Sequence, residues 1–108
     1  MRKGDIVLVP FPFTDMSGQK VRPATVLYHS DKGEDCIVAF ISSIKNKKTK
    51  VFDVSVKAST SNGLKTDSSI KVDKLATLQK KIILGKLGIL ELSIQKVVAE
   101  KLKLLFKI

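Results

Sequence analysis

The sequence predicts a small, mostly β domain, an antiparallel barrel or sandwich that ends in one amphipathic helix. Short apolar stretches recur along the first three quarters of the chain, separated by clusters of Gly, Asp, Asn and Ser. Stretches of this length and spacing are typical of small antiparallel folds. Near residue 93 the apolar spacing changes to the i, i+3, i+4 pattern of a helix face. A chain of 108 residues, 44% of them hydrophobic, is expected to form a single domain over residues 1–108.

The first three predicted strands lie before residue 42. Residues 6–9 form an apolar stretch, which we expect to end at the prolines of segment 10–13, because proline cannot donate a hydrogen bond to a sheet. A turn over residues 14–20 leads to a second strand over 23–28. Residues 36–41 are apolar on both faces, which predicts a central position in the sheet.

The next segments are shorter and more polar. Residues 45–50 form a basic loop, and residues 51–56 alternate in part between apolar and polar side chains, as in a half-buried strand. After a turn over 59–63, two separate short strands are expected at 69–72 and 75–78.

The C-terminal segment is predicted to be a helix that packs on the sheet. Ser93 is a suitable N-cap residue. The apolar positions that follow fall on one face: Ile94, Val97, Val98, Leu102 and Leu105. A membrane-binding helix would carry bulky aromatic residues, and Phe106 is the only one here.

The formal net charge of +10 points to a polyanionic partner. Nucleic acid and an acidic protein would both be attracted by such a field, although a Lys-rich solubilising surface explains the charge equally well. No apolar run is long enough to span a bilayer, and the N-terminal segment lacks the pattern of a secretory signal. Cys36 is the single cysteine, so no internal disulfide can form. We therefore expect a reduced, cytoplasmic protein without a membrane segment.

The residue types present exclude several kinds of active site. One His and one Cys do not make a zinc site, and neither a phosphate-binding loop nor a dinucleotide fingerprint is found, so no metal and no cofactor are expected. A Ser-His-Asp triad would have to use His29, and no nucleophile-elbow pattern accompanies any serine. The residue types that remain for catalysis are Arg, Lys, Ser, Thr and perhaps one acid. They suit cleavage of RNA through the RNA's own 2′-hydroxyl, because the planar guanidinium of Arg presents donors that match the phosphate oxygens.

Several segments of the chain resemble the MazF/PemK family of toxin endoribonucleases. The opening is similar to that of the family, with Lys3 to Asp15 followed by Ser17-Gly18 and then Arg22-Pro23-Ala24. Weaker similarities follow in the same order, at residues 38–43, 63–68, 73–78 and 85–88. The resemblance implies an SH3-like β-barrel with a C-terminal helix, acting as a homodimer that cleaves single-stranded RNA. It also implies neutralisation by an acidic antitoxin whose disordered tail occupies the RNA groove.

The resemblance places the family's catalytic Arg on Arg22 and its catalytic Thr on Ser42. Serine keeps the hydroxyl donor but lacks the methyl group that restricts the rotamer of threonine. Some members carry a Glu five residues before the Arg, where this chain has Ser17. The identity of a general base therefore stays open.

Candidate RNA-binding residues lie in the first loop and at the end of the third predicted strand. They are Thr14, Asp15, Ser17, Gln19, Lys20, Ser43, Lys45, Lys47 and Lys48. The lysines would look the same as solvated surface charge, and Asp15 is also a typical turn residue. Phe11 and Phe13 suit either base stacking or packing. Two other functions also remain open. The first is a non-catalytic module on the same barrel, which binds either a nucleic acid such as DNA or the enzyme DNA gyrase. The second is a toxin homologue that has lost activity.

Overall fold

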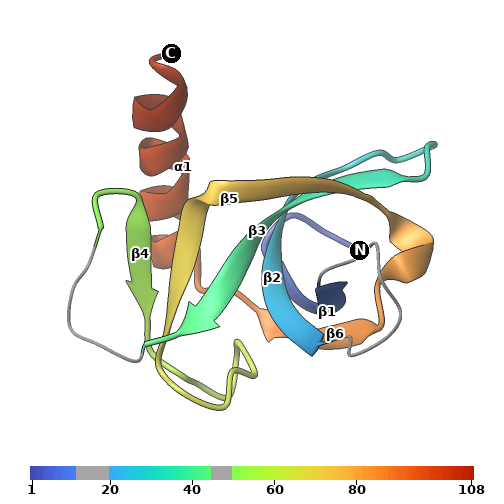
Figure 1. The fold of residues 1–108 in the computed structure, drawn as a ribbon, viewed down its shortest axis with the longest axis horizontal. Coiled ribbons are helices and arrows are strands. Elements are labelled where there is room, and N and C mark those ends of the chain that lie inside the picture. The colour runs from blue at the N-terminus through green and yellow to red at the C-terminus, as the bar shows by residue number, and fades with distance from the viewer. Residues whose placement is uncertain (12–19, 45–49) are drawn as a thin grey trace.

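A computed structural model describes residues 1–11, 20–44 and 50–108, and within these ranges six antiparallel strands form one curled sheet (Figure 1). The elements in chain order are β1 (Asp5–Phe11), β2 (Lys20–His29), β3 (Asp35–Ser43), β4 (Asp53–Val56), β5 (Ser68–Gln79), a 3₁₀ turn η1 (Lys80–Ile82), β6 (Gly85–Ile89) and the helix α1 (Leu92–Phe106). The strands are hydrogen-bonded in the order β4-β5-β3-β2-β1-β6. This architecture confirms the predicted mostly β, barrel-like fold with a C-terminal helix.

The central position predicted for residues 36–41 is confirmed. They belong to β3, which pairs with β2 on one side and with β5 on the other. Ala39 and Ile41 point into one hydrophobic cluster, whereas Val38 points into a second. A strand that is buried on both faces needs apolar side chains at consecutive positions, which is the pattern that the sequence carries.

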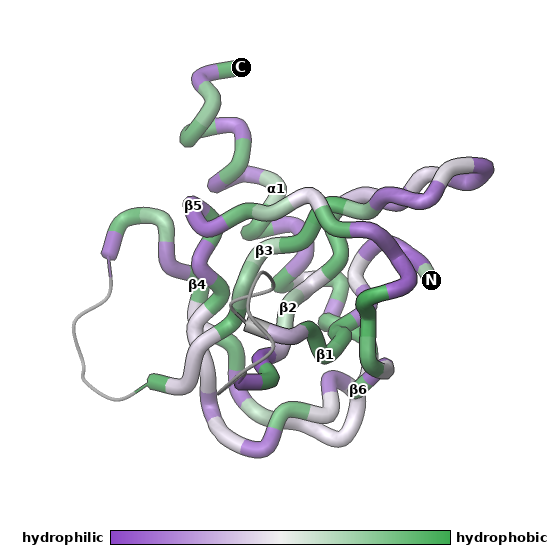
Figure 2. Tube along the Cα trace, turned by 45° about the vertical axis from the view of Figure 1, so that its right-hand side comes forward, coloured by the Kyte–Doolittle hydropathy of each residue, from purple (hydrophilic) through white to green (hydrophobic). Residues whose placement is uncertain are grey.

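The two hydrophobic clusters lie on opposite faces of the strands. The larger one is covered by α1, whose Val98 is 2% exposed and packs there beside Ile6 and Ile70. This contact confirms the amphipathic helix, along which hydrophobic and hydrophilic residues alternate in Figure 2. The second cluster lies on the other face, where Val7 and Val26 pack with Leu78.

β5 is one continuous strand, so the prediction of two separate stretches at 69–72 and 75–78 was wrong. The register on β3 jumps from Phe40 opposite Lys71 to Ala39 opposite Leu75, which leaves residues 72–74 as a bulge. Bulges bend a strand and increase its twist, and β5 turns sharply in Figure 1. The polar pair Asp73-Lys74 that interrupts the apolar pattern is this bulge and not a turn between strands.

The sequence predicted that the first strand would end at the prolines of segment 10–13, and β1 extends into that segment. It continues through Pro10, which pairs with Val21 of β2, to Phe11. On the other side, the pairing with β6 stops at Leu8 opposite Gly85. Among the described residues, Pro10 therefore lies where β1 is paired on one side only, and a missing N–H is tolerated at such an edge.

The helix begins two residues earlier than the predicted cap would place it, with Glu91 and not Ser93 at the N-cap. The side chain of Glu91 makes no capping hydrogen bond. It is engaged instead with the turn before residue 63, accepting from Ser59 Oγ at 2.6 Å. A tertiary contact has therefore overridden the residue preference for capping at this end.

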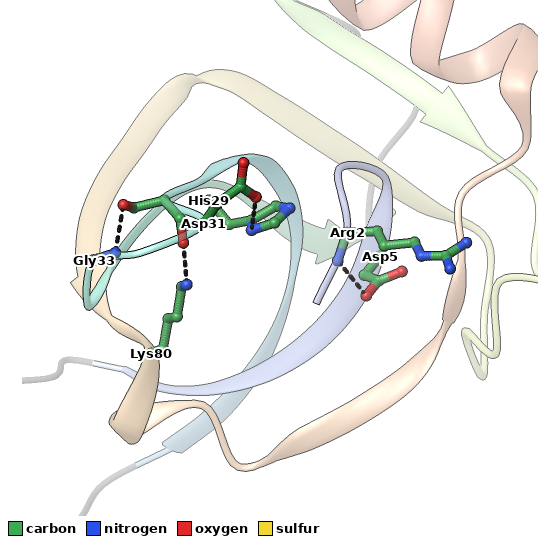
Figure 3. Close-up of polar contacts among 7 residues, drawn as sticks. Arg2, Asp5, His29, Asp31, Gly33 and Lys80 are labelled. Carbon is green, nitrogen blue, oxygen red and sulfur yellow. Dashed lines mark hydrogen bonds and ion pairs between the residues drawn. The ribbon is translucent and has the colours of Figure 1, made fainter.

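Two local turns lie at the start of β1 and between β2 and β3 (Figure 3). The backbone N–H of Arg2 donates to Asp5 Oδ2 at 3.0 Å, which closes the turn that leads into β1. In the β2–β3 hairpin the Lys80 ammonium donates to the carbonyl oxygen of Ser30, tying η1 to the turn. His29 ends β2 with its Nδ1 3.8 Å from Asp31 Oδ1.

Cys36 is a core residue, as expected, with none of its surface exposed. Burial raises the pKa of its thiol, and this effect outweighs the opposing charge of Lys80. No helix in the described part of the chain has the length and apolar character needed to cross a membrane.

Candidate functional site

Arg22 and Ser42 lie on adjacent strands and line the same two grooves. The β2–β3 pairing places Ala24 opposite Phe40, and Arg22 and Ser42 each lie two residues further toward the same end of the hairpin. Because side chains alternate along a strand, both residues share the face of Ala24 and Phe40. The two residues that the sequence singled out for catalysis are thus brought together by the pairing of β2 with β3.

The polar face extends from this pair onto β5 and β4. Ser42 is opposite Ser69 of β5, and Ser69 is in turn opposite Ser55 of β4. Ile70, the next residue on β5, points into the cluster beneath α1. Ser69 and Ser42 therefore share the opposite face with Arg22, and three neighbouring strands carry hydroxyl side chains in one row.

Arg22 and Ser42 line two adjoining grooves. The larger has a volume of about 670 Å³, and the predicted residues Lys20 and Ser43 line it as well. Its far wall is the segment 63–66 with Leu87 of β6. A groove with Lys20 and Arg22 on one wall and Lys65 on the other suits an extended anionic chain.

The second groove has a volume of about 420 Å³ and lies toward the bend of β5. Its apolar wall includes Phe40 and Leu75, and its charged residues besides Arg22 are Lys71, Asp73 and Lys74. An apolar wall beside cations fits a nucleotide, which presents a flat base next to a phosphate. Arg22 and Ser42 stand where the two grooves meet.

Lys71 is a site residue that the sequence reasoning missed. Its ammonium donates to Asp53 Oδ2 at 2.8 Å, across the β4–β5 pairing. The same oxygen accepts the backbone N–H of Lys50 at 3.1 Å. Burial of Asp53 opposes its charge, but the hydrogen bond and the charge of Lys71, together with the Lys50 N–H, hold the pKa of the carboxyl below its ordinary value. The alternation of Ser69 and Lys71 with Ile70 and Val72 was the signal that could have found it.

A buried amide fixes the wall of the larger groove. Asn62 has none of its surface exposed. Its Oδ1 accepts the N–H groups of Ser59 at 3.1 Å and Leu64 at 3.0 Å, and its Nδ2 donates to Lys57 O at 2.8 Å and Glu91 Oε1 at 3.2 Å. The hydroxyl of Ser59 and the amide of Asn62 lower the pKa of Glu91 against a smaller effect of burial. The segment after Asn62 is thereby tied to the start of α1.

The remaining predicted RNA-binding residues lie outside the described part of the chain. They are Thr14, Asp15, Ser17 and Gln19 of the first loop and Lys45, Lys47 and Lys48 of the basic loop. Phe13 also lies outside it, and so does the side chain of Phe11. Within the described residues, no group of three or more His, Cys, Asp or Glu side chains could hold a metal ion.

Comparison with known proteins identifies the family. The sequence profile described as PemK-like, MazF-like toxin of type II toxin-antitoxin system matches residues 2–106. No curated protein sequence matches the chain.

Solved structures share the fold. The MazF crystal structure from Deinococcus radiodurans superposes with a TM-score of 0.79 at 18% identity, covering 100% of this chain and 97% of that one. The Mycobacterium tuberculosis toxin MazF-mt6 gives a TM-score of 0.77 at 20% identity, covering 96% and 97%. An endoribonuclease in complex with its cognate antitoxin, from a Mycobacterial species, gives 0.78 at 14% identity, covering 100% and 96%. Since the family profile spans nearly the whole sequence, the chain belongs to the PemK-like, MazF-like toxins of type II toxin–antitoxin systems.

Proposed function

We propose that this toxin is an endoribonuclease that cleaves single-stranded RNA, including mRNA, by attack of the RNA's own 2′-hydroxyl. The products would carry 2′,3′-cyclic phosphate and 5′-hydroxyl ends. The observation that carries the proposal is the adjacency of Arg22 and Ser42 at the junction of two grooves, in a chain of this family. Relatives of the same fold include chains described as endoribonucleases.

The proposed chemistry assigns a different task to each residue. The scissile phosphate gains negative charge as the 2′-oxygen attacks, and donors aimed at that charge lower the barrier. Arg22 supplies two parallel N–H donors that match two phosphate oxygens. Ser42 supplies one hydroxyl donor from the neighbouring strand. DNA lacks the 2′-hydroxyl, so DNA would bind without being cleaved.

The grooves favour a nucleic acid as the polyanion. Lys20 and Lys65 line the larger groove, whereas Lys71 and Lys74 line the other, so cations flank Arg22 on both sides. Phosphate contacts of this kind give affinity without sequence specificity. The apolar surface of Phe40 beside Arg22 offers a base a place to pack.

The proposal needs no metal ion or other cofactor. The nucleophile belongs to the substrate, and the charge that develops on the phosphate is met by Arg22. Activity should therefore persist in EDTA.

The proposed partners are an acidic cognate antitoxin and a second copy of the chain. The net charge of +10 would draw an acidic tail into the grooves that we assign to RNA, and one relative of the same fold is described in complex with its cognate antitoxin. A homodimer is supported by family membership and by exposed apolar residues on α1, among them Leu92 and Leu104. The cytoplasm, which holds the mRNA substrate, is the proposed location.

Serine at position 42 favours one alternative, a module that binds nucleic acid or gyrase without cleaving. Its side chain rotates more freely than that of threonine, so the hydroxyl is less constrained. Such a module would bind RNA and yield no product.

The deciding experiment is a digestion of single-stranded RNA in EDTA with analysis of the product ends. Wild-type protein should give cyclic phosphate and 5′-hydroxyl ends, and Arg22→Ala should lose at least about a hundredfold in rate while keeping its Tm. Arg2→Ala is the matched control, because Arg2 is the only other arginine in the chain and lines neither groove. Normal cleavage by Arg22→Ala would rule out the assignment, and binding without products would favour the alternative.

A further inference from the structure

Ser69 is a buried hydroxyl within the polar row of the site. It is 7% exposed, and its Oγ has no hydrogen-bond partner among the described residues. Its cross-strand neighbours are Ser42 of β3 on one side and Ser55 of β4 on the other. Ser55 is exposed, whereas Ser42 lines both grooves.

A buried hydroxyl without a partner is unfavourable for folding. Burial removes the water that would bond to it, and the loss is not recovered unless a protein group replaces that water. Alanine would occupy this position at a lower cost in free energy. We therefore expect the hydroxyl of Ser69 to form a hydrogen bond in another state of the molecule.

Ser42, which lies opposite Ser69, can accept this hydrogen bond. Serine hydroxyls directly opposite each other on antiparallel strands are close enough to form a hydrogen bond. Ser42 has no γ-methyl to fix its rotamer, so its hydroxyl needs an external constraint if it is to point at a phosphate. Lys71, on the same face of β5, is already bonded to Asp53.

We propose that Ser69 is a positioning residue for Ser42. In the RNA complex the Ser69 O–H donates to Ser42 Oγ, and the Ser42 O–H donates to an oxygen of the scissile phosphate. The first bond fixes the rotamer of Ser42 and polarises its hydroxyl, because hydrogen bonds in a chain strengthen one another. No proton is transferred between these groups, and Ser69 does not touch the substrate. The inference rests on the proposed ribonuclease function.

The test separates kcat from KM and from stability. With saturating RNA, Ser69→Ala should lower kcat about five- to tenfold, the loss expected for one hydrogen bond, and leave KM unchanged. Its Tm should equal or exceed that of the wild type, because the variant removes a buried hydroxyl that bonds to none of the described residues. Ser55→Ala, the exposed neighbour on the other side, is the matched control and should keep the wild-type kcat.

A double-mutant cycle with Ser42→Thr tests the coupling. Threonine restricts its own rotamer, so Ser69→Ala should lower kcat less in the Ser42→Thr background than in the wild type. Ser69→Thr keeps the hydroxyl and should retain most of the wild-type kcat. A wild-type kcat in Ser69→Ala, an equal loss in both backgrounds, or a loss that follows a lowered Tm would overturn the positioning role alone. A wild-type chain that cleaves no RNA would overturn the proposed function, and this inference with it.

Discussion

The ammonium of Lys71 lies 2.8 Å from Asp53 Oδ2, and this contact joins β5 to β4 beside the smaller groove. Asp53 is 8% exposed, so its carboxylate depends on Lys71 and on the Lys50 N–H for the bonds that water would otherwise provide. We expect the pair to affect both the stability and the proposed RNA binding, and the two effects can be measured separately.

The first prediction concerns the pH dependence of stability. The folded-state pKa of Asp53 lies below its ordinary value of 3.8. The stability from its charged form is therefore complete above that ordinary value and is lost as the pH falls through the folded-state pKa. At pH 7, Asp53→Asn should lower the free energy of unfolding by about 1–3 kcal/mol. The deficit should shrink as the pH is lowered below about 4, where the wild type protonates as well.

Denaturant unfolding from pH 7 to pH 3 measures this difference. Glu34→Gln, in the exposed β2–β3 turn, is the control for loss of a carboxylate at the surface. A deficit for Asp53→Asn that stays constant with pH would contradict the assigned role of its charge.

The second prediction concerns Lys71 and the salt dependence of RNA binding. A cation that meets a phosphate releases counterions, and each such contact on a single strand contributes about 0.7 to the slope of log K against log salt. Lys71→Met should weaken binding of a 2′-deoxy-substituted, uncleavable RNA and reduce that slope by about 0.7 or less. The slope falls by less than this amount to the extent that Asp53 already neutralises the Lys71 ammonium.

The matched control is Lys96→Met, an equal loss of charge on the exposed face of α1, away from both grooves. The two slopes are measured by fluorescence anisotropy over a range of salt concentrations. Equal slopes for the two variants would show that Lys71 acts through the overall charge of the molecule and not through a local contact.

The third prediction concerns Gly63, which forms part of the wall of the larger groove. Its φ of +71° is strained for any residue with a side chain, and an added Cβ would lie 2.1 Å from the carbonyl oxygen of Leu87. Gly63→Ala should therefore lower stability by about 2 kcal/mol or more, because backbone rather than a flexible side chain must move. It should also raise the KM for RNA by displacing the groove wall.

Gly85→Ala is the control for Gly63→Ala. Gly85 begins the same strand as Leu87, and a Cβ added there would meet no atom within 4 Å. The thermal unfolding of both variants is compared with that of the wild type. If the two alanine variants unfold at the same temperature, the close approach to Leu87 is not what makes glycine necessary.

The sequence predicted those parts of the fold that depend on local patterns. Residues 36–41 are apolar on both faces because β3 is buried on both, and that is visible without knowing its neighbours. The continuity of β5 was missed because Asp73-Lys74 looks like a break, and only the register on β3 shows that it is a bulge. β6 was missed because two glycines in five residues lower strand propensity, while its place beside β1 is decided by tertiary pairing.

In the candidate site, too, some residues could be predicted from the sequence and others depend on how the strands pair. Arg22 and Ser42 were found through the family resemblance of the sequence, and each lies next to a predicted strand, but the pairing of these strands as β2 and β3 is shown by the structure. Lys71 and Ser69 were missed because their roles depend on the order β4-β5-β3. That order brings Asp53 and Ser42 to the two sides of β5. No local sequence pattern specifies which strands pair when they are far apart along the chain.

The last prediction concerns the hydroxyl at position 42. Ser42→Ala removes one donor to the developing charge and should lower kcat by about a hundredfold with little change in Tm, because the side chain is only half-buried at the end of β3. Ser42→Thr keeps the donor and adds the methyl group that restricts its rotamer, so its kcat should equal or exceed that of the wild type. Ser55→Ala is the control, since the exposed Ser55 of β4 lines neither groove. Single-turnover cleavage of a defined RNA measures all three rates. If Ser42→Ala cleaves as fast as Ser55→Ala, then the Ser42 hydroxyl takes no part in the reaction, and Arg22 acts without a second donor from β3.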